Sequence, residues 1–179
     1  MRLINYLDNK EIRRDVEPLF LTAFPNNERP PVDYYFANFD KPNDQLFGFY
    51  EEEKFIGFAS VVLYKDICYI FFLAVSENER NKGYGSQIIS LLKEKYCDYT
   101  LLLCYEEVDE KYPDFLMRKR REQFYLRNGF HKNPLMSKEF GVVYQTAVIG
   151  DRLVTFEEYQ EIFKNGFGSH TLPYLEKYK

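Results

Sequence analysis

The sequence from Tyr69 to Tyr96 reads YIFFLAVSENERNKGYGSQIISLLKEKY and combines three elements. Tyr69 to Val75 is an apolar run rich in β-branched and aromatic residues, and its length suits a buried strand. Ser76 to Arg80 is polar and predicts a turn. From Gly85 onward apolar residues recur at helical spacing, which predicts an amphipathic helix to Tyr96. The whole stretch therefore predicts a strand that leads through a short turn into a helix.

Gly83 and Gly85 stand at the start of the predicted helix, where they leave backbone N–H groups uncovered by a Cβ atom. A helix N-terminus carries unpaired N–H donors and the positive end of the helix dipole, so it suits a phosphate. The two common glycine-rich phosphate loops are not matched. There is no GxxxxGK[ST], and Ile88 takes the place of the third glycine in GxGxxG. A nucleoside triphosphate or dinucleotide site is therefore disfavoured, and a glycine pair that only shapes a tight turn remains an alternative.

Two phrases of this sequence together resemble the GNAT family, the Gcn5-related N-acetyltransferases. The first is Leu73-Ala74-Val75 followed by Arg80-x-x-Gly83-x-Gly85, and the second is Phe124-Tyr125 followed by Gly129-Phe130. The resemblance extends over about residues 2–150. It implies an α/β (α+β) fold with a mixed, mostly antiparallel sheet, splayed parallel central strands and flanking helices. We expect a GNAT-like acetyltransferase domain over residues 1–150, with residues 151–179 as a helical extension of the same domain.

The rest of the chain supplies the other elements of such a sheet. Thr100 to Tyr105 is almost wholly apolar and predicts a strand parallel to the one that begins at Tyr69. The other expected elements, in chain order, are a strand over 2–7, a helix capped by Asp8 or Asn9 and ended by Pro25-Asn26-Asn27, a helix over 31–39, strands over 46–50 and 55–64, a helix opened by Arg118 to Arg121 and stopped at Gly129, a strand over 141–149, and a helix capped by Thr155 and Glu158. A glycine-containing segment, 166–169, is expected to free the tail.

Composition limits the classes of function. The 179 residues suit a single domain, and a net charge of -4 with a pI near 5.4 argues against a nucleic-acid binder. The three cysteines have no CxxC spacing, so neither zinc nor a disulfide framework is expected. No secretory segment or membrane span is recognised, which predicts a cytoplasmic protein. The sequence does not decide between a monomer and a homodimer.

The resemblance to GNAT enzymes also implies a binding mode for acetyl-CoA as cosubstrate. Its pantetheine arm is expected along Leu73, Ala74 and Val75. Its pyrophosphate is expected on the turn and first helical residues, which are Arg80, Asn81, Lys82, Gly83, Tyr84, Gly85 and Ser86. No metal is implied.

Acyl transfer from a thioester to an amine needs a proton for the departing thiolate and an acceptor for the proton of the amine. Tyr125 matches the position from which many family members offer a phenol to the CoA sulfur, and a pKa near ~10 keeps a phenol protonated at neutral pH. Glu106, at the end of its strand, is the first candidate for the base, and Glu107 and Tyr105 are rivals. Cys104 is disfavoured as a nucleophile because neither histidine has an identifiable pairing with it.

An acidic segment follows the strand that ends near Tyr105, and it contains Glu106, Glu107, Asp109, Glu110 and Asp114. These carboxylates favour a cationic amine as acceptor, although they can also serve only to keep a loop soluble. The sequence thus predicts an acetyl-CoA-dependent N-acetyltransferase, which acts on a primary amine of a small molecule or peptide by direct attack in a ternary complex. The alternative is a non-catalytic acyl-CoA-binding module that regulates a partner.

Overall fold

The computed structural model of the protein describes residues 1–26 and 28–178. Two of the predicted segments include residues outside this part: Asn27 of the turn after the first helix, and Lys179 at the end of the C-terminal extension. The chain forms two compact units. Unit 1 contains Met1–Leu63 and Ile70–Lys95, and unit 2 contains Tyr64–Tyr69 and the chain from Tyr96 onward.

The strands follow the order β1-β2-β3-β4-β5-β7-β6-β8 in an eight-stranded sheet, which is mostly antiparallel with one parallel pair, β4 and β5. The predicted fold class is therefore confirmed. Register links Ile67–Tyr69 of β4 to residues 100–102 of β5. This pairing covers the first third of β4, which then continues into unit 1.

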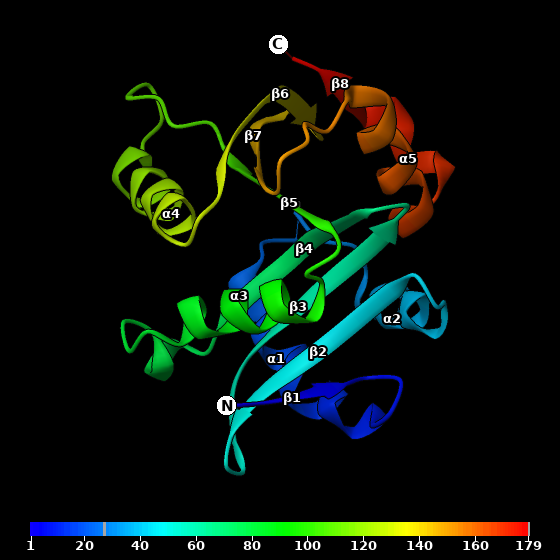
Figure 1. Cartoon of the computed structure of the whole chain (residues 1–179), viewed down its shortest axis with the longest axis vertical. Helices are drawn as coiled ribbons and strands as arrows, with labels where there is room; N and C mark the ends of the chain where they lie inside the picture. The colour runs from blue at the N-terminus through cyan, green and yellow to red at the C-terminus, as the bar shows by residue number, and fades with distance from the viewer. Residues whose placement is uncertain (27, 179) are drawn as a thin grey trace. The chain divides into compact units, whose positions relative to one another are not determined.

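Unit 1 contains the N-terminal strands of the sheet and the helices that come before residue 96. Figure 1 shows its strands β2, β3 and β4 side by side, with α3 following β4 along the chain. The elements are β1 (Arg2–Asn5), η1 (Lys10–Ile12), α1 (Arg13–Ala23), α2 (Val32–Ala37), η2 (Asn38–Asp40), β2 (Asp44–Glu51), β3 (Lys54–Tyr64), β4 (Ile67–Val75), η3 (Glu77–Glu79) and α3 (Tyr84–Lys95).

The core of unit 1 is largely aromatic. Phe20 on α1 stacks on Tyr35 of α2 with ring centroids 4.1 Å apart, and its edge meets Phe72 of β4 at 5.2 Å. Aromatic pairs in these geometries stabilise a core beyond the area that they bury. The helices α1 and α2 are thereby held on β4, the strand that leads to the predicted phosphate site.

The first two helices of unit 1 have boundaries that differ from expectation. The first predicted helix begins as a 3-10 turn, in which the side chain of Asn9 accepts from Glu11 N–H, and becomes α-helical only at Arg13. Asn9 rather than Asp8 is therefore the cap. The second predicted helix changes to a 3-10 turn after Ala37. Such tighter turns at helix ends are common, because they satisfy backbone groups that lack an i→i−4 partner.

Unit 2 contains the parallel strand β5 and the C-terminal half of the chain. Its further elements are β5 (Thr100–Glu106), α4 (Phe115–Arg127), β6 (His131–Glu139), β7 (Val142–Ile149), α5 (Phe156–Phe167), η4 (Ser169–Tyr174) and β8 (Leu175–Lys177). α4 begins three residues earlier than the basic run that was expected to open it. Its last residue is Arg127, and the chain turns at Gly129 as predicted, where φ is 96° and the N–H groups of Gly129 and Phe130 donate to Leu126 C=O and Tyr125 C=O.

The C-terminal segment is more than a helix. α5 has the predicted capping box, since Thr155 accepts from Glu158 N–H and the Glu158 side chain accepts from Thr155 N–H. The expectation that residues 166–169 free the tail is wrong. Leu175–Lys177 pair with Glu139–Ser137 of β6 as an additional antiparallel strand, β8. Backbone pairing of a hydrophobic residue, Leu175, with a sheet edge explains why the tail is ordered there.

Candidate functional site

The junction between β4 and α3 in unit 1 forms the predicted turn, with more local structure than the sequence indicates. After Val75 the chain makes a 3-10 turn, Glu77–Glu79, and then turns through Asn81 and Gly83, which have φ values of 63° and 84°. A Cβ added at Gly83 would meet nothing within 4 Å. Gly83 is therefore required by its backbone conformation and not by lack of space.

Helix α3 begins at Tyr84, one residue before the predicted start. Gln87 N–H donates to Gly83 C=O at 3.2 Å, which is the i→i−4 bond of the first turn. The N–H groups of Tyr84, Gly85 and Ser86 precede that bond, and the geometry of a helix provides no intrahelical acceptor for them. The positive end of the helix dipole lies at the same place. This end of α3 has the donor arrangement that an anion requires.

A buried carboxylate, Glu79, holds the turn in place. Its side chain accepts from Lys54 at 2.5 Å and from Lys82 at 3.2 Å, and Glu79 itself is only 4% exposed. The hydrogen bond from Lys54, helped by the one from Lys82, lowers the pKa of Glu79. Arg80 is exposed, and its Nε donates to Val75 C=O at 3.2 Å. Sequence reasoning missed Glu79, for which the spacing of three residues from Lys82 was the available signal.

The end of β4 presents an apolar, half-buried face next to this turn. Leu73 and Val75 are half-buried, whereas Ala74 between them is buried. Gly57 of β3 lies against Ala74, because a Cβ built on Gly57 would come within 2.3 Å of Ala74 C=O. Ser76 N–H also donates to Ile56 C=O at 2.8 Å. The position of the β4 end thus depends on a glycine in a neighbouring strand, which sequence reasoning did not single out.

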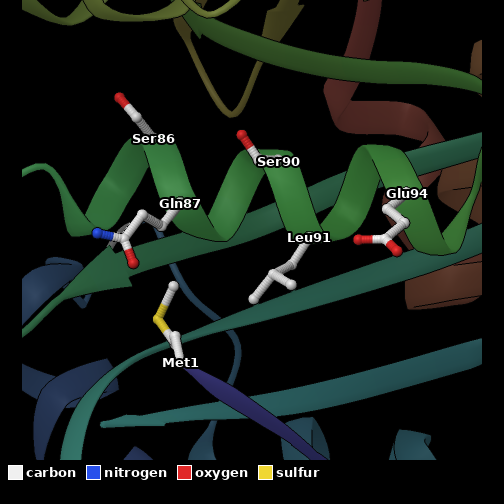
Figure 2. A pocket seen from close by; sticks show the side chains of 6 residues that line it. All are labelled: Met1, Ser86, Gln87, Ser90, Leu91 and Glu94. Carbon is white, nitrogen blue, oxygen red and sulfur yellow. The ribbon is translucent and has the colours of Figure 1, made fainter.

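An open groove of about 350 Å³ runs along the flank of α3. Figure 2 shows Gln87 and Leu91 projecting from the helix towards Met1, while Ser86 and Ser90 project from its other side. The lining also includes Glu94 near the end of the helix. The groove therefore follows the side of α3 and reaches Ser86 in its first turn.

The two predicted catalytic residues lie together in unit 2. Tyr125 on α4 is half-buried, and its ring stacks on Tyr105 of β5 with centroids 5.8 Å apart. Burial raises the pKa of Tyr125 to about 12, the charge of Arg121 lowers it, and the neighbouring Cys104 and Glu106 raise it. The phenol therefore stays protonated at neutral pH, as a proton donor must.

Glu106 is buried at the end of β5 and forms an ion pair with Arg121 of α4. The sequence placed Arg121 in a basic run but did not identify this partner. Of the rivals for the base, Tyr105 donates to Glu122 at 3.3 Å, and Glu107 accepts from Lys111 at 2.8 Å and from Tyr112 at 2.9 Å. All three candidates are thus engaged with partners in unit 2.

The acidic segment carries less uncompensated charge than its sequence suggests. Besides the pairs of Glu106 and Glu107, Asp109 lies 3.2 Å from Lys111, and Asp114 lies 2.8 Å from Arg118. Three basic residues of the same unit, one of them shared, therefore pair with four of the five carboxylates. Their spacing of four residues along the chain accounts for two of these pairs, Glu107 with Lys111 and Asp114 with Arg118. Within the described ranges, no group of three His, Cys, Asp or Glu residues is arranged to hold a metal ion.

The chain matches the family model of the acetyltransferase (GNAT) family over residues 11–130, and so it belongs to that family. The matched region includes the β4–α3 junction and the α4–β5 cluster. No curated protein matches the chain. Among residues 1–26 and 28–178, no helix has the length and apolar character that crossing a membrane requires.

Solved structures of the same fold are similar to this chain at low sequence identity. One from Bacteroides thetaiotaomicron, assigned to the GNAT family, has 19% identity and a TM-score of 0.76, with 94% of this chain and 99% of that chain covered. An aminoglycoside 6'-N-acetyltransferase complexed with coenzyme A has 12% identity and a TM-score of 0.68, covering 85% and 99%. A GNAT family acetyltransferase from Elizabethkingia anophelis with acetyl-CoA bound has 16% identity and a TM-score of 0.60, covering 84% and 97%.

Proposed function

We propose that this protein is an acetyl-CoA-dependent N-acetyltransferase that transfers the acetyl group directly to a primary amine in a ternary complex. The observation that carries the proposal is the β4–α3 junction, where unpaired N–H groups of a helix follow a half-buried apolar strand end in a member of the GNAT family. Relatives of the same fold have coenzyme A or acetyl-CoA bound.

In this proposal the junction binds the cosubstrate in two parts. The N–H groups of Gly83 to Ser86 receive the pyrophosphate, and Arg80 and Lys82 add positive charge at the same turn. The apolar residues Leu73, Ala74 and Val75 accompany the pantetheine arm. A backbone N–H of this strand end polarises the thioester carbonyl, which stabilises the negative charge that develops on its oxygen.

The reaction needs two proton transfers besides the attack. The amine nitrogen forms a bond to the thioester carbonyl carbon, and the carbon–sulfur bond then breaks. Tyr125 gives its proton to the sulfur that leaves, while a base takes the proton of the amine nitrogen. Glu106 remains the first candidate for that base, and it would take the proton through a water molecule.

The acceptor is proposed to be a primary amine of a small molecule or a peptide. A cationic amine remains our expectation, but the ion pairs of the acidic segment reduce the charge on which it was based. Steering by charge should then be modest and should weaken with added salt.

The alternative of a non-catalytic acyl-CoA-binding module is favoured by one observation, the ion pair that engages Glu106. One experiment separates the two functions. Purified protein is incubated with acetyl-CoA and a panel of polyamines, aminoglycosides, amino acids and N-terminal peptides, and CoA release is measured beside calorimetric binding of CoA. Binding with acceptor-dependent release supports the enzyme. Binding without release by any amine supports the module, and absence of binding contradicts both.

A further inference from the structure

Five side chains of unit 2 form a continuous hydrogen-bonded chain, which we call the Cys104–Glu139 chain. Tyr69 Oη lies 3.1 Å from Cys104 Sγ and 3.0 Å from Tyr159 Oη. Tyr159 Oη donates to Glu139 Oε1 at 2.7 Å, and Ser137 Oγ donates to the same oxygen at 2.6 Å. The chain thus connects four strands or helices of one unit: β4, β5, β6 and α5.

The chain is closed to solvent at one end and approaches the surface at the other. Tyr69, Tyr159 and Ser137 are at most 1% exposed, and Glu139 is 8% exposed. Cys104 is half-buried. It lies two residues before Glu106 on the same face of β5, and the ring of Tyr105 between them stacks on Tyr125. The outer end of the chain is therefore on the strand that carries Glu106 and contacts Tyr125.

An ionised Glu139 fixes the direction of every bond in the chain. A carboxylate only accepts, so the proton of Tyr159 points to Glu139. Tyr159 Oη must then accept from Tyr69, and Tyr69 Oη must accept from the Cys104 thiol. When Glu139 is protonated, the carboxyl group can donate and the same bonds can reverse. A chain of hydroxyl groups with this property can pass a proton along by moving each proton one bond further.

Glu139 has the proton affinity that such a terminus needs. Burial raises the pKa of Glu139 to about 7, against the lowering effect of its bonds from Ser137 and Tyr159. The other titratable groups of the chain, Tyr69 on β4, Cys104 on β5 and Tyr159 on α5, have raised pKa values and stay neutral. The sheet partners of Glu139, Val142 on β7 and Leu175 on β8, are apolar. A proton acceptor with a pKa near the working pH is the most effective kind.

We propose that the Cys104–Glu139 chain carries the proton released by the acceptor amine to Glu139, which thereby acts as the final proton acceptor of the acetyl transfer. The inference rests on the proposed function and puts Glu139 in place of Glu106, which is ion-paired with Arg121, as the final acceptor of the amine proton. In the step, one N–H bond of the amine breaks and its proton goes to Cys104 Sγ. The thiol proton moves to Tyr69, the Tyr69 proton to Tyr159, and the Tyr159 proton to the Glu139 carboxylate.

The buried end of this chain lies outside the region that the GNAT family model matches. Ser137, Glu139 and Tyr159 all follow residue 130, and Tyr159 comes from α5 in the C-terminal segment. The proposal therefore gives α5 a role: it supplies the hydroxyl that joins Tyr69 to Glu139.

The pH profile of kcat/KM with a verified acceptor tests the relay. The wild-type protein is expected to show a rise in activity with a midpoint near pH 7, as Glu139 ionises. Glu139→Gln and Tyr159→Phe should both lose this rise and about 10²-fold of kcat. Two matched controls in unit 2 should keep both: Glu161→Gln, whose side chain is 46% exposed, and Tyr174→Phe, at an exposed position. If the Glu139→Gln and Tyr159→Phe profiles match that of the wild type, the relay is overturned.

Substitutions at Cys104 separate a relay from a structural role. A serine hydroxyl can pass a proton and alanine cannot, so Cys104→Ser should restore the pH-dependent rise that Cys104→Ala loses. Equal profiles for these two variants would contradict the proposal. Calorimetric affinity for CoA should be the same in both, which excludes a loss caused by cosubstrate binding. This pair also keeps the proposal testable if Glu139→Gln fails to fold.

A stability measurement tests the titration of Glu139 without any activity. Because its pKa rises from 4.5 to about 7 on folding, the contribution of Glu139 to stability is complete below pH 4.5 and is lost as the pH rises through about 7. The urea midpoint of the wild type should therefore fall more between pH 5 and pH 8 than that of Glu139→Gln. Equal falls would overturn the assignment of Glu139 as the titrating terminus.

The activity measurements distinguish failure of the relay from failure of the proposed function. If the wild type released no CoA with any amine, both would fail. If the wild type were active and the variants had unchanged pH profiles, only the relay would be overturned.

Discussion

The β4–α3 junction takes all its predicted residues from one continuous run, Leu73 to Ser86, whereas the cluster around Tyr125 takes side chains from β5 and α4. In the proposed function the junction acts mainly through its backbone: N–H groups at a helix start, and positive φ values at Asn81 and Gly83. The cluster is proposed to act through side chains whose state depends on partners, such as Glu106 with Arg121. A backbone site tolerates changes of charge but not of conformation, and a side-chain site has the opposite sensitivity.

The largest expected effect concerns the strand that carries the junction. Gly57→Val should destabilise the protein by about 1–3 kcal/mol or more, because the new side chain would meet the Ala74 backbone, which cannot move aside as a flexible side chain would. Urea denaturation measures the loss, and calorimetry should show weaker CoA binding in the protein that remains folded. Unchanged stability would mean that the close approach of β3 to β4 is not required.

A smaller loss is expected for Tyr125→Phe, which tests the side-chain cluster. The stacked ring is retained, so folding and CoA affinity should be close to those of the wild type. General acid assistance is typically worth ~10²–10⁴-fold, and a thiolate is already a fair leaving group, so kcat should fall by at most about 10²-fold, or ~2.7 kcal/mol. kcat and kcat/KM should fall together. An unchanged kcat in steady-state kinetics would remove Tyr125 from the acid role.

Gly83→Ala tests the backbone of the junction. Space is available, but a φ of 84° lies in the left-handed region, which costs an L-residue about 1–2 kcal/mol. We expect CoA affinity to fall by about tenfold by calorimetry, since 1.4 kcal/mol corresponds to a factor of ten. Gly83→Asn is the matched control and should lose less, because asparagine tolerates this region, as Asn81 does with φ of 63°. Similar losses of CoA affinity for both variants would mean that the presence of any side chain at position 83, and not the backbone conformation, weakens binding.

The smallest effect is expected for Arg80→Gln, which removes an exposed charge from the same turn. Exposed ion pairs contribute about 0.2–1 kcal/mol, so the Kd for CoA should rise by no more than about fivefold. Since salt screens such charges, the difference from the wild type should shrink when binding is measured at high ionic strength. A loss greater than that of Gly83→Ala would reverse the comparison and make charge the main determinant of the junction.

Local patterns along the chain account for the elements that were predicted well. The apolar run before Val75, the helical spacing after Gly85 and the capping box of Thr155 and Glu158 depend on residues close in sequence. The end of α4 at Gly129 is of the same kind. The prediction that residues 166–169 free the tail failed because the tail is held by a contact between residues far apart in the sequence. Pairing of Leu175 with Glu139 joins residues distant in sequence, and no local pattern specifies that pairing.

From its residues alone the chain could be identified as an α/β protein of GNAT type, because the motif that carries the resemblance lies within one strand, one loop and the first turn of one helix. Folding decided which charges have partners. Glu79 meets Lys54, Glu106 meets Arg121, and Glu139 is joined to Cys104 through two tyrosines. Burial and partners set the proton affinity of an ionisable group, and both arise only when segments far apart in sequence pack together.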